Sequence, residues 1–191
     1  THGVPNVVNA HPHSSEIVSV VHNGIIENSD DIKKKLELKG LKFKSQTDTE
    51  VITLLITEAL KDEKPLESVF KTLKQLKGSF ALGIIFKNYK DIIIGARRGS
   101  PLAVGYSNQE NYIGSDSYAL KSMTNKITYL DDGDICILSN DKIEFYNSSN
   151  NKINKEVLTL SNDKQLADKG DYKDFMSKEI NEQNVTTKTC I

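Results

Sequence analysis

The sequence predicts an α+β layered sandwich, and two observations carry this prediction. Helical patterns are grouped between residues 29 and 78. From Gly78 onward the pattern changes to short apolar runs separated by Asn, Asp, Gly and Ser, which is typical of strands joined by tight turns. Grouped helices followed by such strands favour antiparallel sheets with helices packed on them over alternating βαβ units.

The first strand signal is the stretch VVHNGIIEN at residues 20–28. An Asn-Gly pair between two apolar runs is the strongest short-range signal for a two-residue β-hairpin. We therefore predict strands over residues 17–21 and 25–28, joined by a tight turn at Asn23 and Gly24.

The first helix is predicted directly after this hairpin. Ser29 can cap a helix through the stretch DDIKKKLEL, and Gly40 can end it. The alternating stretch LKFK at residues 41–44 then predicts a short strand.

Two more helices follow. Residues 47–60 carry apolar side chains at helical spacing and begin with Thr47-x-x-Glu50, the pattern of a capping box. Pro65 stands at the start of a third helix with one apolar face, which Gly78 stops.

The second half of the chain predicts strands, one short helix and a tail. After Asn147 the composition shifts to Asn, Lys, Asp and Ser, so we predict a domain over residues 1–147 and a polar tail and linker over 148–191, with a short helix near 174–183. The strands are expected at residues 79–86, 91–96, 102–106, 111–116, 127–130, 134–138 and 142–146, and the short helix at 117–123.

Composition excludes several classes of function. The 25 basic and 26 acidic residues give a net charge of -1, which provides no electrostatic reason to expect nucleic acid or an anionic membrane as a partner. No apolar run is long enough to span a membrane. Of the two cysteines, Cys136 lies in a strand-like run, where we expect it to be buried and inert, and Cys190 lies near the C-terminus. This usage favours a cytoplasmic protein over a disulfide framework.

All four histidines lie within the first 22 residues: His2, His11, His13 and His22. The stretch HPH at residues 11–13 would place two imidazoles on one side of an extended segment, which makes a zinc site conceivable. No cysteine lies near, and Glu16 is the only close carboxylate. Histidines of a loop or core are therefore favoured, and we expect neither a metal nor a cofactor.

Three polar features each allow two interpretations. Asp48 either complements a helix N-terminus or receives the ammonium group of a ligand. Asn23 and Gly24 form either a plain turn or the donors of an oxyanion hole. Arg97 and Arg98 either grip a phosphate or lie in a solvated turn, and the turn is favoured because no P-loop pattern surrounds them.

Taken in order, the motifs resemble a known family. The stretches are THG at residues 1–3, NAHPH at 9–13, HNG at 22–24, TDTEV at 47–51, RRGSPL at 97–102, GSD at 114–116, LDDGDI at 130–135 and FMSKEINEQ at 175–183. Their combination resembles the glutaminase domain of glutamine:fructose-6-phosphate aminotransferase (glucosamine-6-phosphate synthase), a class II glutamine amidotransferase. The resemblance covers nearly the whole chain.

The resemblance implies a fold and a set of site residues. The fold would be the four-layer αββα sandwich of N-terminal-nucleophile hydrolases, incomplete here at its N-terminus. Asn23, through its side-chain amide, and Gly24, through its backbone N–H, would form the oxyanion hole. Thr1 and His2 would help to hold the α-carboxylate of glutamine, and Asp48 would receive its α-ammonium. The family's glutaminase site uses no metal.

The sequence also departs from the family pattern. Family members begin with a cysteine whose thiolate attacks the glutamine amide, and no such residue precedes the THG stretch here. We therefore expect the chain to be catalytically silent alone. Thr1 could act as an N-terminal nucleophile in principle, but its match to THG favours a binding role. Fructose 6-phosphate would bind only through a C-terminal sugar-isomerase domain that is absent from these residues, and the resemblance implies a homo-oligomeric parent enzyme.

The function predicted from these residues is the glutaminase half of an aminotransferase that makes glucosamine 6-phosphate and glutamate from fructose 6-phosphate and glutamine. Glutamine is the expected partner, and its amide hydrolysis would release ammonia. Two alternatives stay open: a non-catalytic glutamine-binding or interaction module with the same fold, and an amidotransferase with a different ammonia acceptor.

Overall fold

The computed structural model describes residues 3–108, 110–160 and 170–189. The chain divides into two compact units, Thr1–Leu160 and Ser161–Ile191. The first unit contains both sheets, and the described part of the second contains helix α5 (Phe175–Thr189). None of the described helices is long and apolar enough to cross a membrane.

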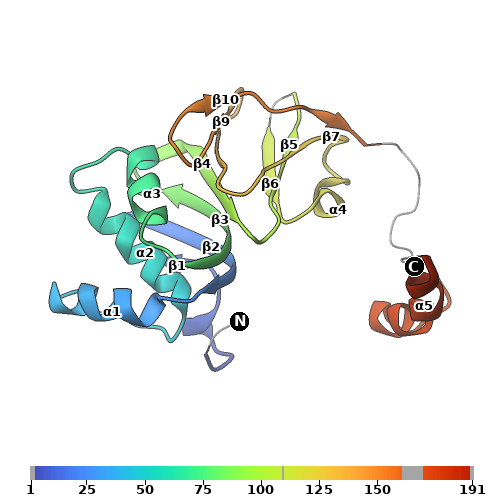
Figure 1. Ribbon diagram of the computed structural model, residues 1–191, viewed down its shortest axis with the longest axis horizontal. Helices are drawn as coiled ribbons and strands as arrows, with labels where there is room; N and C mark the ends of the chain where they lie inside the picture. The colour runs from blue at the N-terminus through green and yellow to red at the C-terminus, as the bar shows by residue number, and fades with distance from the viewer. Residues whose placement is uncertain (1–2, 109, 161–169, 190–191) are drawn as a thin grey trace. The chain divides into compact units, whose positions relative to one another are not determined.

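The larger sheet is antiparallel throughout and has seven strands in the order β1-β2-β3-β4-β8-β9-β10 (Figure 1). Its strands are β1 (His13–Ser14), β2 (Val18–Ile26), β3 (Gly78–Phe86), β4 (Tyr89–Arg98), β8 (Ile135–Leu138), β9 (Ile143–Tyr146) and β10 (Lys152–Ile153).

The smaller sheet packs on one face of the larger one. It has the order β11-β7-β5-β6, with β5 (Ala103–Tyr106), β6 (Asn111–Gly114), β7 (Lys126–Tyr129) and β11 (Leu158–Thr159). Between the sheets, Val104 of β5 shares a buried cluster with Cys136 and Leu138 of β8. The one-turn helix α4 (Ser117–Leu120) lies on the smaller sheet and inserts Leu120 beside Ala103 and Ile127.

Three helices cover the other face of the larger sheet: α1 (Ser29–Leu38), α2 (Asp48–Ala59) and α3 (Pro65–Leu73). A single turn of 3-10 helix, η1 (Val7–Asn9), precedes β1. The main core lies under these helices, where Ile52 and Ile56 of α2 meet Val20 of β2 and Leu82 and Ile84 of β3, all fully buried. The layers are therefore helix, sheet, sheet, helix, as expected for the predicted α+β sandwich.

The predicted hairpin at Asn23 and Gly24 is wrong. Strand β2 runs through both residues and pairs with β3 without a break from Val18↔Phe86 to Ile26↔Gly78. Pairing along nine residues that buries Val18 and Ile26 outweighs the local turn preference of Asn-Gly. The glycine is still required, because Gly24 has a φ of 136° and an added Cβ would lie 2.2 Å from the carbonyl oxygen of Ser79.

The predicted strand at residues 41–44 is also absent, and the predicted capping box of Thr47 and Glu50 does not form. The Glu50 carboxylate accepts the backbone N–H groups of Lys44 and Ser45 at 2.9 and 2.6 Å, rather than that of Thr47. These donors are therefore not available to a strand partner. Thr47 occupies the N-cap position, but its side chain makes no capping hydrogen bond.

Helix α1 begins and ends close to the predicted positions. Asn28 occupies the N-cap position and Ser29 is the first helical residue. The Asn28 amide bonds to the backbone of Gln75 and Lys77, which ties the helix start to the entry of β3. At the other end the Leu41 N–H donates to Leu36 O, the 6→1 bond of a Schellman motif, which confirms the stop at Gly40.

The sheets continue beyond Asn147. Strands β10 and β11 lie in the segment that its composition assigned to a polar tail, and the compact unit extends to Leu160. These strands are two residues long and sit at sheet edges, so they lack the apolar run on which sequence recognition depends.

Candidate functional site

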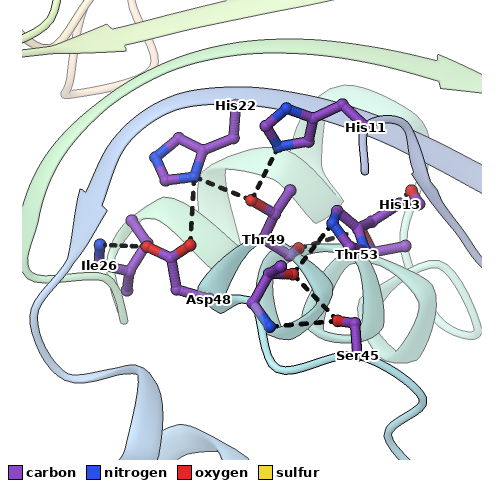
Figure 2. Close-up of polar contacts among 9 residues, drawn as sticks. His11, His13, His22, Ile26, Ser45, Asp48, Thr49 and Thr53 are labelled. Atoms are coloured by element: carbon purple, nitrogen blue, oxygen red, sulfur yellow. Dashed lines mark hydrogen bonds and ion pairs between the residues drawn. The ribbon is translucent and has the colours of Figure 1, made fainter. Parts of the chain in front are cut away.

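The candidate site is built where helix α2 meets strand β2. Asp48 is the first residue of α2 and is 7% exposed. Its Oδ2 accepts the backbone N–H of Ile26 at 2.8 Å, and its Oδ1 lies 3.8 Å from Nδ1 of His22 (Figure 2). The start of a helix stabilises this negative charge, so a carboxylate is held in place with both oxygens directed toward β2.

Two imidazoles meet at one hydroxyl beside this carboxylate. Figure 2 shows His22 and His11 both directed at Thr49, whose Oγ1 lies 3.1 Å from Nδ1 of His22 and 3.1 Å from Nε2 of His11. Partial burial and the neighbouring His13 ring lower the pKa of His11 below its ordinary value of 6.5, although the nearby Asp48 opposes this shift.

The third histidine belongs to a separate chain of hydrogen bonds. His13 is buried, and its Nε2 lies 3.0 Å from the Thr47 hydroxyl. That hydroxyl lies 3.0 Å from the Ser45 hydroxyl, which donates to Glu50 at 2.6 Å. Because Ser45 donates its only hydroxyl proton to Glu50, Thr47 donates to Ser45 and His13 donates to Thr47. Glu50 therefore fixes a proton on Nε2 of His13.

Asn23 and Gly24 lie on β2 between His22 and Ile26. Successive side chains of a strand point to opposite faces, so Asn23 points away from the helix side on which His22 lies. Beyond Val20, the edge of β2 that faces away from β3 is paired with no strand among the described residues. The backbone of residues 22–26 is therefore reachable along that edge, which is the edge that Asp48 approaches.

A pocket with a cavity volume of about 130 Å³ adjoins this strand. Its walls come from both sheets and from the loop before β1, and they include His11, His22, Asn23, Ala81 and Leu102. His11 and His22 thus contribute to the wall of the pocket that Asn23 also lines, although the His22 and Asn23 side chains point to opposite faces of the strand.

A comparison with known proteins decides the family. Residues 9–122 match the family described as "Glutamine amidotransferase domain", which is more than half of the 191 residues. The chain belongs to the glutamine amidotransferase family. The matched range includes Asn23, Gly24 and Asp48.

Curated relatives agree with this family. The chain is 48% identical over 186 residues to the glutamine–fructose-6-phosphate aminotransferase (isomerizing) of Zymomonas mobilis, a match that covers 97% of this chain and 31% of the relative. The protein of the same name from Mesorhizobium japonicum is 46% identical over 184 residues, covering 96% and 30%. The chain spans about a third of the length of these relatives.

Solved amidotransferase structures share the fold. The glutamine phosphoribosylpyrophosphate amidotransferase of B. subtilis matches with a TM-score of 0.63 and 24% identity, covering 79% of this chain and 34% of that one. A structure described as the allosteric regulatory enzyme of purine biosynthesis gives a TM-score of 0.62 and 25% identity, covering 75% and 32%. These likenesses confirm the predicted sandwich of N-terminal-nucleophile type.

Two of the predicted site residues of this amidotransferase chain, Thr1 and His2, lie outside the described residues. The other three lie on adjoining elements: Asn23 and Gly24 on β2, where Asn23 lines the pocket, and Asp48 on α2, from which it bonds to the backbone of β2. In the described ranges, no group of three His, Cys, Asp or Glu side chains is arranged to hold a metal ion.

Both arginines of the RRGSPL stretch are structural rather than phosphate ligands. Arg97 donates to the carbonyl oxygens of Ser100 and Leu130. Arg98 donates to Leu76 O at 2.9 Å and to Leu73 O at 3.4 Å, where it neutralises the carbonyl end of α3. The structure thus favours neither a phosphate site nor a freely solvated turn.

Cys136 is fully buried, as predicted. Burial raises the pKa of its thiol to about 12, so a thiolate nucleophile does not form there near neutral pH.

Sequence reasoning missed Thr49 and the role of the histidines. The spacing HPH favours histidines of a loop or core over a zinc site but does not show their partners, and His11 and His13 bond to two different threonines, Thr49 and Thr47. The available signal was the pair of threonines that flank Asp48, since hydroxyls at a helix start are free to bond outside the helix.

Proposed function

We propose that this chain forms the glutamine site of a glutaminase that releases ammonia for the synthesis of glucosamine 6-phosphate from fructose 6-phosphate. The observation that carries the proposal is the buried Asp48 carboxylate, held at the open edge of β2 beside Gly24 in a chain of the amidotransferase family. The relatives are named glutamine–fructose-6-phosphate aminotransferases, which supports fructose 6-phosphate as the acceptor of the ammonia.

Each site residue has a proposed role. Asp48 receives the α-ammonium of glutamine through the oxygen that faces His22. Thr1 and His2 hold the α-carboxylate. Backbone N–H groups two residues apart on a strand point to the same edge, so the Gly24 N–H is expected beside that of Ile26, which donates to Asp48.

Gly24 and Asn23 are proposed to stabilise the oxyanion. The Gly24 N–H and the Asn23 amide would donate to the oxygen on which negative charge develops when the glutamine amide is attacked. A paired strand suits this role, because its backbone does not reorganise during the reaction.

The attacking group is proposed to lie outside these residues. Cys136 is buried with a raised pKa, so the sulfur chemistry of the family has no candidate among the described residues. We therefore propose that residues 1–160 bind glutamine without hydrolysing it alone, within a cytoplasmic enzyme whose sugar-binding and oligomer contacts lie elsewhere. This same observation also favours the second candidate, a glutamine-binding module without catalysis.

Glutamine binding to the purified chain tests the site. We expect millimolar glutamine to raise the midpoint of thermal unfolding, by an amount equivalent to about 1.4 kcal/mol at ten times the Kd. Asp48→Asn should weaken glutamine binding at least about tenfold, because it removes the charge that pairs with the ammonium.

Asp31→Asn is the matched control, since Asp31 is an exposed acidic residue in the first turn of α1. Equal loss of binding in both variants, or no binding by the unchanged chain, would contradict the proposal.

A chimera separates the enzyme from the binding module. The 186-residue matched region of the Zymomonas mobilis relative is replaced by the corresponding residues of this chain. An enzyme domain should retain glutamine-dependent formation of the amino sugar, and should lose it with Asp48→Asn. A chimera that binds glutamine yet releases no glutamate would favour the module.

A further inference from the structure

Thr49 occupies an unusual position, because its single hydroxyl contacts a ring nitrogen of each of two histidines. The distances to Nε2 of His11 and Nδ1 of His22 are both 3.1 Å. Thr49 is 2% exposed and His22 is 5% exposed. Water therefore has little access to the His22 side of this contact if the hydroxyl is removed, whereas His11 is exposed.

The Thr49 hydroxyl has a single hydrogen to share between the rings of His11 and His22. A hydroxyl carries one hydrogen and can accept others, so it donates to one of two neutral rings and accepts from the other. Oδ1 of Asp48 lies 3.8 Å from Nδ1 of His22, and a carboxylate favours a protonated nitrogen at that atom. His22 therefore donates from Nδ1, and the Thr49 hydroxyl donates to Nε2 of His11.

We propose that Thr49 is a positioning residue of the glutamine site, whose hydroxyl holds His22 against Asp48 and fixes the ring of His11 at the pocket. This inference rests on the proposed role of Asp48 as the ammonium receptor. Nδ1 of His22 lies 3.8 Å from Oδ1 of Asp48, as Figure 2 shows, so a displaced ring changes the environment of Oδ1 directly.

The alternative is that Thr49 only completes the start of α2. Thr53 provides the comparison, because it is equally buried and lies one turn further along the same helix. Its hydroxyl donates to the carbonyl oxygens of Thr49 and His13, not to a ring nitrogen. Thr→Val at either position removes one buried hydroxyl with little change of shape, so only Thr49→Val should disturb the imidazoles.

The experiment uses the full chain with ¹⁵N-labelled histidine. Long-range ¹H–¹⁵N spectra above pH 7 report which ring nitrogen carries the proton. In the unchanged chain we expect a protonated Nδ1 and a bare Nε2 in His22, and a bare Nε2 in His11. Thr49→Val should shift both sets of ring signals and weaken glutamine binding, measured by calorimetry, about tenfold, the effect of one buried hydrogen bond. Thr49→Ser, which keeps the hydroxyl, and Thr53→Val should both bind glutamine within about threefold of the unchanged chain.

Two results would overturn the inference: ring signals that Thr49→Val leaves in place, or glutamine affinity that it leaves unaltered. If the unchanged chain binds no glutamine, the proposed function fails. The ring signals then still decide whether Thr49 holds the two histidines.

Discussion

Asp48 shows how one residue can stabilise a helix start while its carboxylate faces a neighbouring strand. Its position in the first turn of α2 stabilises the helix, and its buried oxygens face β2 rather than solvent. The two interpretations offered by the sequence are therefore compatible. The sequence could identify the carboxylate, because TDTEV has a helical start, but it could not show that Ile26, 22 positions earlier, would contact it.

The histidines show that spacing in the sequence does not identify the hydrogen-bond partners of a side chain. His11 and His13 are two residues apart, yet they join different hydrogen-bond networks that begin at Thr49 and Thr47. The separation depends on where α2 packs, and no local pattern records that packing.

The lowered pKa of His11 predicts a pH dependence of stability. The unfolded chain takes up a proton at His11 near its ordinary pKa of 6.5, whereas the folded chain does so at lower pH. Stability is therefore complete above that value and falls as the pH drops through it toward the folded pKa. Urea unfolding of His11→Gln between pH 7.5 and 5 should show a smaller loss than the unchanged chain. Parallel curves for the two proteins would refute this assignment.

Strand β2 shows that pairing with a distant strand can override a local turn signal. An Asn-Gly pair is a local signal, and the nine paired residues of β3 that override it lie more than fifty positions away. Helices α2 and α3 were predictable because the apolar spacing of each, and the proline at the start of α3, are contained within the segment itself. The edge strands β10 and β11 were not, since their pairing depends on partners elsewhere in the chain.

Gly24→Ala should destabilise the chain strongly. The new Cβ would lie 2.2 Å from the Ser79 carbonyl oxygen at a φ of 136°, so the β2–β3 ladder must shift. We expect a loss of roughly 2–4 kcal/mol in the free energy of unfolding, measured in urea.

Gly40→Ala is the control for the effect of positive φ alone. Gly40 has a φ of 86° and nothing within 4 Å of the added atom. This substitution should lower the free energy of unfolding by only about 1 kcal/mol. A Gly24 variant no less stable than the Gly40 variant would show that the close approach to Ser79 does not constrain the strand.

At the scale of the whole molecule, the first compact unit ends later than the change of composition suggests. Residues 148–160 look polar, yet they contribute a strand to each sheet. Lys155 also makes ion pairs with Asp131 and Asp134. Polar composition predicts exposure, and edge strands are exposed without being disordered.

Two truncations test this boundary. A chain that ends after Leu160 keeps both sheets, so its unfolding midpoint should stay within about 2 °C of the full chain. A chain that ends after Asn147 loses β10, β11 and the Lys155 ion pairs, and should unfold at least about 5 °C lower. Thermal unfolding followed by circular dichroism gives the midpoint of each truncated chain. Equal midpoints for the two chains would place the domain boundary at residue 147.

The Asn-Gly step inside β2 also affects how the protein ages. In flexible chains this step deamidates readily, because glycine offers little steric hindrance to attack by its nitrogen on the asparagine side chain. That reaction closes a five-membered ring, which an extended strand paired with β3 does not permit. Asn23 is therefore protected for as long as the strand is formed, and the rate at which it converts to aspartate, followed by peptide mapping, should track the unfolded fraction.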